Sequence, residues 1–131
     1  MSMELWSLFA VGGMLFVTIA IQATYMDLTS GVGYALSSRD DPPPKEGVIG
    51  ERLARAVRNQ TEGAAVWMPL VLVALQTDTS NSFTYWASVA MIVGRILYVP
   101  FYMLGLNPLR SMAWLGFFFG TPVFIYGLLF A

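Results

Sequence analysis

Charged residues divide the chain into four long apolar stretches. Residues 5–26, 63–77 and 111–131 hold no charge, and residues 83–104 hold one, Arg95. A helix needs about 20 apolar residues to cross roughly 30 Å of hydrocarbon. The pattern therefore predicts an all-α membrane protein, a bundle of four transmembrane helices over about residues 4–27, 50–76, 82–104 and 109–130. No repeat or second domain interrupts residues 1–131.

Three prolines and a pair of small residues lie inside these spans. Membrane helices tolerate Pro69, Pro100 and Pro122 where neighbouring helices re-satisfy the freed backbone groups. Gly116 and Gly120 form a small-xxx-small pair that predicts a close helix contact in the fourth span. A signal peptide is the rival interpretation of the first span, but no positive segment precedes it and its apolar run is too long.

The basic residues predict the orientation. Arg39 and Lys45 lie in the first connection, about residues 28–49, and Arg110 opens the fourth span. Lys and Arg are enriched on the cytoplasmic side of membrane proteins. We therefore expect the first and third connections in the cytoplasm and both termini outside, in the periplasm if the membrane is a bacterial inner membrane. Residues 37–46, with three successive prolines, predict a solvated polyproline segment.

Composition removes several classes of chemistry. The chain is 56% hydrophobic and 11% charged, whereas soluble domains carry about 25% charged residues. It contains no cysteine and no histidine. A disulfide, a thiolate nucleophile, an imidazole base and a Cys/His metal site are therefore excluded, and we expect no metal. The net charge of −1 and the lack of a basic block argue against a nucleic-acid partner.

The remaining polar residues fall on defined helix faces. At 100° per residue, the second span carries a polar stripe within an arc of about 120°. This stripe consists of Arg52, Arg55, Arg58, Asn59 and Glu62. By the same arithmetic, the third span places Arg95, Tyr98 and Tyr102 within about 60°. Arg110 and Ser111 open the fourth span on the same side of the membrane.

These charges support two interpretations. Arg55, Arg58, Arg95 and Arg110 outnumber Glu62 by about three charges at one membrane level, which favours an anionic ligand held by arginine forks. No side chain is an obvious general base, so the ligand would supply the reactive group, such as a thiol activated beside Arg110. Alternatively, Arg58, Glu62 and Arg95 form a structural ion-pair network, and Arg52 and Arg55 extend to lipid headgroups.

Two blocks resemble a known family. Residues 51–62 read E-R-L-A-R-A-V-R-N-Q-T-E, and this run is similar to the R-N-x-x-E signature of the MAPEG proteins (membrane-associated proteins in eicosanoid and glutathione metabolism). The second block, residues 95–102 with residues 107–111, resembles the family's arginine, tyrosine and R-S elements. The D-D-P-P-P run of the first connection is more similar to bacterial members. The resemblance covers nearly the whole chain.

The resemblance implies a homotrimer of four-helix bundles with glutathione between adjacent subunits, open to the cytoplasmic side. By matching positions, the tripeptide would be bound by Arg55, Arg58, Asn59, Glu62, Arg95, Tyr98 and Tyr102. Glu62 would meet the α-amino group and the arginines the carboxylates. Arg110 matches the arginine that stabilises the thiolate, with Ser111 as its neighbouring hydroxyl.

Three hypotheses follow. The first is a membrane-bound glutathione-dependent transferase or peroxidase, with its lipophilic electrophile in an apolar cleft near the first and fourth spans. The second is a non-catalytic scaffold or accessory subunit with the same fold, in which the aromatic residues 114–119 form a packing surface or lipid belt. The third, a small drug-exporting transporter, needs an accessible membrane carboxylate. Glu62 is crowded by arginines, which disfavours it.

Overall fold

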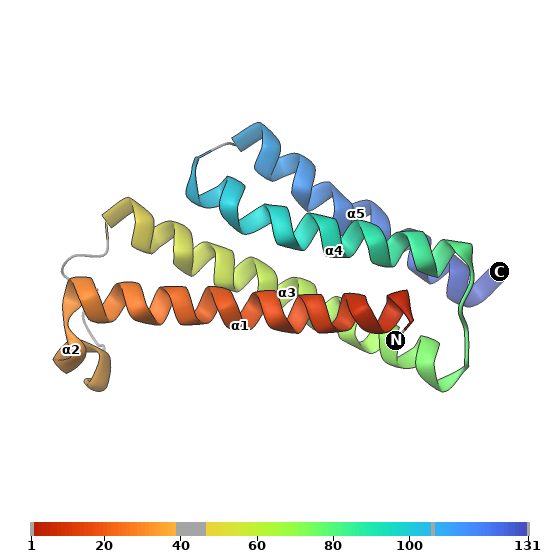
Figure 1. Cartoon of the computed structure of the whole chain (residues 1–131), viewed down its shortest axis with the longest axis horizontal. Coiled ribbons are helices and arrows are strands. Elements are labelled where there is room, and N and C mark those ends of the chain that lie inside the picture. The colour runs from red at the N-terminus through yellow and green to blue at the C-terminus, as the bar shows by residue number, and fades with distance from the viewer. Residues whose placement is uncertain (1, 39–46, 106, 131) are drawn as a thin grey trace.

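The described residues fold into four long helices and one short helix (Figure 1). The computed structural model describes residues 2–38, 47–105 and 107–130. The helices are α1 (Met3–Ser30), α2 (Val32–Leu36), α3 (Gly47–Gln76), α4 (Ser82–Met103) and α5 (Asn107–Phe130). The four long helices begin and end close to the four predicted spans, the largest differences being at Ser30 and Gly47.

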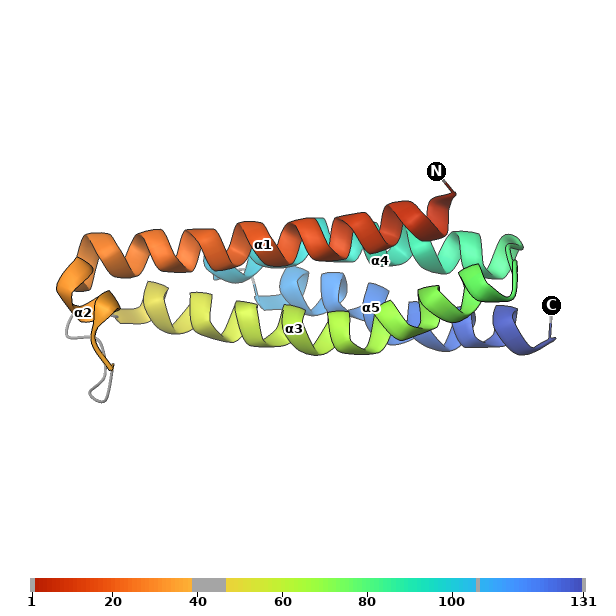
Figure 2. The same cartoon turned by 90° about the horizontal axis from the view of Figure 1, so that it is seen from below.

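The long helices pack as two pairs. The α4–α5 contact is the most extensive, and α1 packs against both α3 and α4. Figures 1 and 2 show both termini at one end of the bundle together with the connection between α3 and α4. The opposite end carries α2, the last turn of α4 and the first turn of α5. The two predicted cytoplasmic connections therefore lie at the same end of the molecule.

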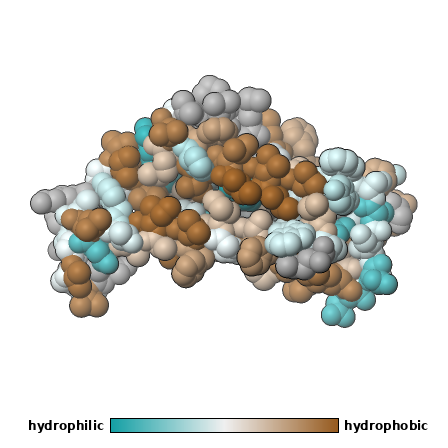
Figure 3. All heavy atoms as spheres, in the orientation of Figure 1, coloured by the Kyte–Doolittle hydropathy of each residue, from teal (hydrophilic) through white to brown (hydrophobic). Residues whose placement is uncertain are grey.

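In the part of the chain that the structure describes, two helices have the length and composition of membrane spans, namely α1 and α4. α5 contributes a shorter apolar segment, Trp114–Phe130. α3 is apolar in its second half but carries charged residues in its first half. Large apolar side chains are exposed on the outside, among them Phe16 at 72% and Trp86 at 64%. Figure 3 shows such residues gathered over the middle of one face. An apolar exterior of this kind suits a lipid environment.

The larger cluster of buried apolar residues, which includes Trp67 and Phe124, lies between the helices toward the end that carries the termini. The Trp67 ring of α3 packs on Phe124 of α5, with ring centroids 4.8 Å apart. Trp67 Nε1 donates a hydrogen bond of 2.9 Å to Ser7 Oγ. Glu4 Oε1 is buried and accepts hydrogen bonds from Thr84 Oγ1 at 2.6 Å and Ser80 Oγ at 3.1 Å. These polar links fasten the first turn of α1 to α3 and α4.

Helix α4 begins at a capping box. The Asn81 side chain accepts the backbone N–H groups of Phe83 and Thr84, and the Thr84 hydroxyl accepts the N–H of Asn81. This arrangement satisfies donors that a helix start leaves without an intrahelical partner. Asn81 Nδ2 also donates to the carbonyl of Gly127 at 3.0 Å, which joins the start of α4 to α5.

The close contact predicted at Gly116 and Gly120 is confirmed. A Cβ atom on Gly116 would lie 2.8 Å from the carbonyl oxygen of Ala90, and one on Gly120 would lie 3.3 Å from that of Ala87. The backbones of α4 and α5 therefore approach to a distance that side chains at these positions would prevent. The prolines predicted inside the spans are also found within helices, at Pro69, Pro100 and Pro122.

The first connection differs from its prediction. α1 continues to Ser30, and the short helix α2 follows directly where an open loop was expected. Gly31, with φ of 89°, makes the break between them because this backbone region favours glycine. The polyproline prediction falls largely on residues 39–46, which lie outside the described residues.

Candidate functional site

The polar stripe of α3 has an outer and an inner edge. Arg55, Arg58 and Glu62 are exposed on the outer edge, and Arg52 and Asn59 are half-buried on the inner edge, toward α4. The helix geometry accounts for this order, because Asn59 and Arg52 lie at one limit of the arc and Arg58 at the other. The sequence predicted one stripe, and the fold gives its two edges different surroundings.

Arg95 lies in the interior, at 3% exposure, where α4 meets α3. Its Nη1 donates a hydrogen bond of 3.0 Å to Asn59 Oδ1. Its guanidinium carbon lies 5.0 Å from the ring centroid of Phe117, a cation–π geometry. Its Nη2 is buried and has no hydrogen-bond partner among the described residues, and a Cβ on Gly63 would lie only 2.8 Å from it. Arg95 therefore fits because residue 63 lacks a side chain.

Tyr98 and Tyr102 share the buried face of α4 with Arg95, as the helix arithmetic predicted. Both rings are buried in a cluster with Ala56 and Val99, and their centroids are 5.7 Å apart. The Arg95 guanidinium carbon lies 5.8 Å from the Tyr98 centroid. Within one chain, these three residues form an inner layer behind the stripe of α3.

Ser111 and Arg110 occupy the first turns of α5. Ser111 is exposed. The position of the Arg110 side chain lies outside the described residues. The backbone of α5 nevertheless begins at the end of the bundle that also carries the start of α3, so both residues lie at the same end as the stripe (Figure 1).

The ion pairs differ from the network that the structural alternative requires. In the part of the chain that the structure describes, neither Arg58 nor Glu62 forms an ion pair, and Arg95 contacts Asn59 rather than Glu62. Arg55 instead lies 3.8 Å from Glu51, and both side chains are more than half exposed. On the outer edge, the carboxylate of Glu62 and the guanidinium of Arg58 therefore have no oppositely charged partner among the described residues.

Sequence reasoning missed three contacts. Arg52, which the structural alternative extends to lipid headgroups, instead donates a hydrogen bond of 3.1 Å from Nη1 to the carbonyl of Met103. The space at Gly63 and the ring of Phe117 both shape the surroundings of Arg95. The position of Gly63, one helical turn after Asn59, could have indicated from the sequence that it lies on the same side of α3. The contact with Phe117 could not be predicted, because it depends on how α4 and α5 pack.

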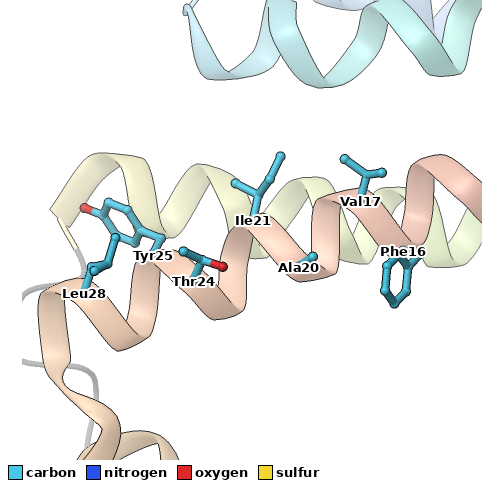
Figure 4. A pocket seen from close by; sticks show the side chains of 7 residues that line it. All are labelled: Phe16, Val17, Ala20, Ile21, Thr24, Tyr25 and Leu28. Carbon is cyan, nitrogen blue, oxygen red and sulfur yellow. The ribbon is translucent and has the colours of Figure 1, made fainter.

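Apolar hollows on the outside of the bundle include two that are lined by described residues of α1. One, of about 530 Å³, is a groove between α1 and α4, whose α4 wall is Ile92 and Ile96. The other, of about 450 Å³, runs along α1 from Phe16 to Leu28, and Figure 4 shows Val17 and Ile21 pointing from it toward the space beneath α4. Among the described residues α1 and α5 do not pack together. Both hollows lie on α1 and neither is lined by a described residue of α5, so the cleft expected near the first and fourth spans stays a prediction.

The site can bind charged and apolar groups but offers few donors to a metal. Residues 2–38, 47–105 and 107–130 contain no group of three or more His, Cys, Asp or Glu side chains placed to hold a metal ion. What it offers are guanidinium groups, one free carboxylate, an amide and hydroxyls. Such groups recognise carboxylates and an ammonium through charge-assisted hydrogen bonds.

The comparisons with known proteins agree with the sequence blocks. The model of the MAPEG family matches residues 3–130. The comparison with curated proteins and the comparison with solved structures gave no match.

Proposed function

The chain belongs to the MAPEG family, whose members are integral membrane proteins, and from this premise we propose that it is a membrane-bound glutathione-dependent transferase or peroxidase acting on lipophilic electrophiles. The family includes glutathione-dependent transferases and also non-catalytic members. The observation that carries the proposal is the exposed outer edge of α3, where Arg58 and Glu62 are not neutralised by each other or by another described residue.

The charges on this edge match those of glutathione. The tripeptide carries two carboxylates and one ammonium group. Arg55 and Arg58 offer guanidinium groups to the carboxylates, and Glu62 offers a carboxylate to the ammonium. The Asn59 amide, held by Arg95, lies beside them. A ligand of this kind would supply the partner charges that the chain leaves open.

Arg95, Tyr98 and Tyr102 would form the inner wall of the proposed site. All three are buried within the chain, so they act on a ligand through the layer in front of them. Arg95 does so through its hydrogen bond to Asn59, which fixes the direction of the amide. The two tyrosines pack beneath Ala56, on the same helix as the arginines.

The proposed assembly is a homotrimer. The outer edge of α3 faces away from its own bundle, so a ligand bound there needs a second wall. A neighbouring copy would provide it. The same arrangement would let α1 of one copy face α5 of another, and α5 would then add a wall to the apolar hollow on α1.

Glutathione would supply a thiol as the nucleophile or reductant. Arg110 and Ser111, in the first turns of α5, are the proposed catalytic residues. A cation beside a thiol favours its thiolate, which is the reactive form. The hydroxyl of Ser111 can donate a hydrogen bond to the same sulfur. The apolar hollow on α1 would hold the substrate that arrives through the bilayer.

We also propose a place for the site in the cell. The first half of α3, the start of α5 and α2 share one end of the bundle (Figure 1), and the two longer helices bring Arg52, Arg55, Arg58 and Arg110 to it. The positive-inside rule puts that end in the cytoplasm, where glutathione is present, and both termini on the other side of a bacterial inner membrane.

A second candidate is a non-catalytic scaffold with the same fold. The buried Arg95–Asn59 hydrogen bond favours it, because a link between α3 and α4 stabilises the bundle with or without a ligand. The exposed Arg58 and Glu62 favour the first candidate, because neither contributes to that link.

The test is a glutathione titration of the detergent-solubilised protein by calorimetry, with the ultraviolet absorbance of the thiolate measured in parallel. Saturable binding with a thiolate signal near neutral pH is the expected result, and a screen of lipophilic electrophiles would follow. Binding without a thiolate signal would refute the proposed catalytic role of Arg110. No binding at millimolar glutathione, in a protein that keeps its assembly, would overturn the proposal and leave the scaffold.

A further inference from the structure

The side chain of Arg52 binds the end of another helix. Its Nη1 lies 3.1 Å from the carbonyl oxygen of Met103, the last residue of α4. The last four carbonyls of a helix have no intrahelical partner, and a cation at this end is favoured by the helix dipole. Arg52 comes from α3, so its guanidinium caps a helix that is remote from it in sequence.

The segment beyond Met103 is a tight turn built around this contact. The N–H of Leu104 donates to the carbonyl of Pro100 at 3.0 Å, and that of Gly105 donates to the carbonyl of Tyr102 at 3.1 Å. Gly105 has φ of 73°, a conformation that favours glycine. A Cβ on Gly105 would lie 3.4 Å from both Nη1 and Nη2 of Arg52. The guanidinium therefore packs against the turn as well as bonding to it.

One residue, outside the described ranges, separates Gly105 from α5, which begins at Asn107. We propose that Arg52 is a positioning residue: by capping α4 it fixes the turn between α4 and α5, and so sets where the first turns of α5, with Arg110 and Ser111, stand relative to the polar stripe of α3. Arg52 lies one helical turn before Arg55 on the same stripe. Helix α3 thus carries both the arginines proposed to contact the ligand and the arginine that caps the end of α4. The catalytic part of this inference rests on the proposed function; the cap does not.

Hydrogen exchange tests the cap directly. In Arg52→Met, a residue of similar length without donors, the Leu104 and Gly105 amides should exchange roughly tenfold faster than in the unsubstituted protein, because a hydrogen bond from a charged donor is lost. Arg52→Lys keeps one charged donor and should restore part of the protection. Arg55→Met is the matched control, since its guanidinium contacts Glu51 and not the turn, and it should leave both amides unchanged.

Two results would overturn the proposal. One is equal protection of the turn in Arg52→Met and in the unsubstituted protein. The other is an equal loss of protection in Arg55→Met, which would attribute the effect to general loss of charge on α3. If Arg52→Met does not fold, Gly105→Ala provides the second route, because it strains the same turn with the arginine in place. It should raise exchange at Leu104; unchanged protection there would contradict the tight packing on which the proposal rests.

The functional readout separates positioning from ligand contact. In Arg52→Met the dissociation constant of glutathione should change less than threefold, because Arg55, Arg58 and Glu62 remain. The pH midpoint of the thiolate absorbance should rise, because the start of α5 is no longer fixed. A tenfold weaker affinity with an unchanged midpoint would make Arg52 a ligand contact instead. If the unsubstituted protein binds no glutathione, the proposed function fails while the exchange experiment still decides the cap.

Discussion

The Arg95 guanidinium of α4 donates a hydrogen bond of 3.0 Å to the Asn59 side chain of α3, inside the bundle. A carboxylate would be the stronger partner for a buried cation, yet Glu62, one turn away, is exposed. The bundle therefore holds its buried arginine with an amide and aromatic faces and leaves the carboxylate of α3 on the outside.

Glu62→Gln should weaken glutathione binding. The substitution keeps the shape of the side chain and removes the charge proposed to meet the ligand ammonium. Removing one partner of a charged pair that becomes buried costs about 2–5 kcal/mol. Calorimetric titration of the solubilised protein measures the change. Glu51→Gln, which removes an exposed carboxylate about three helical turns before Glu62, is the control and should change the affinity much less. Equal affinity in Glu62→Gln would remove Glu62 from the site.

Gly63→Ala should destabilise the fold through Arg95. The new Cβ would lie 2.8 Å from Nη2, so the guanidinium must move and its bond to Asn59 is lost. The expected cost is about 1–3 kcal/mol, measured as a lower midpoint of thermal unfolding. Gly12→Ala is the matched control because nothing lies within 4 Å of its Cβ position. That substitution should be neutral or slightly stabilising, since alanine favours helices. Similar losses in both variants would contradict the tight packing at Gly63.

Gly116→Ala should cost more stability than Gly120→Ala. The Cβ at position 116 would meet a backbone oxygen at 2.8 Å, and a backbone cannot rotate away as a side chain can. At position 120 the corresponding distance is 3.3 Å, which a small shift relieves. Overpacking of this kind costs roughly 1–3 kcal/mol. Thermal unfolding of the two variants should rank them in this order, and the reverse order would show that α4 and α5 pack differently.

Glu4→Gln should loosen the end of the bundle that carries the termini. The Glu4 carboxylate accepts hydrogen bonds from Thr84 and Ser80, and an amide accepts them less strongly. The loss should be about 1–3 kcal/mol. A double-mutant cycle with Thr84→Val isolates the shared hydrogen bond from other effects. Additive losses in the cycle would mean that Glu4 stabilises the fold without Thr84.

The four long helices follow from the sequence because charges fall almost entirely outside four apolar stretches. Helical periodicity also placed Arg95, Tyr98 and Tyr102 on one face, and they share a buried face. The periodicity alone left open which neighbour each face meets. Arg52 shows this limit: its position on the stripe follows from the sequence, whereas its bond to Met103 depends on the approach of α3 to the end of α4. The break at Gly31 was missed because one residue in a left-handed conformation leaves the hydrophobic pattern unchanged.

The length of α3 has a consequence for how the protein is prepared. Its 30 residues extend over about 45 Å, while the hydrocarbon layer is about 30 Å thick. In the proposed orientation the apolar second half of α3 lies in the hydrocarbon layer, so the first half with its arginines would reach the level of the phosphates. Anionic phospholipids and anionic detergents carry the same oxyanions that arginines prefer, so we expect them to compete for Arg55 and Arg58. The affinity of the protein for an anionic ligand should therefore be measured in a zwitterionic or uncharged detergent, which does not compete for these arginines.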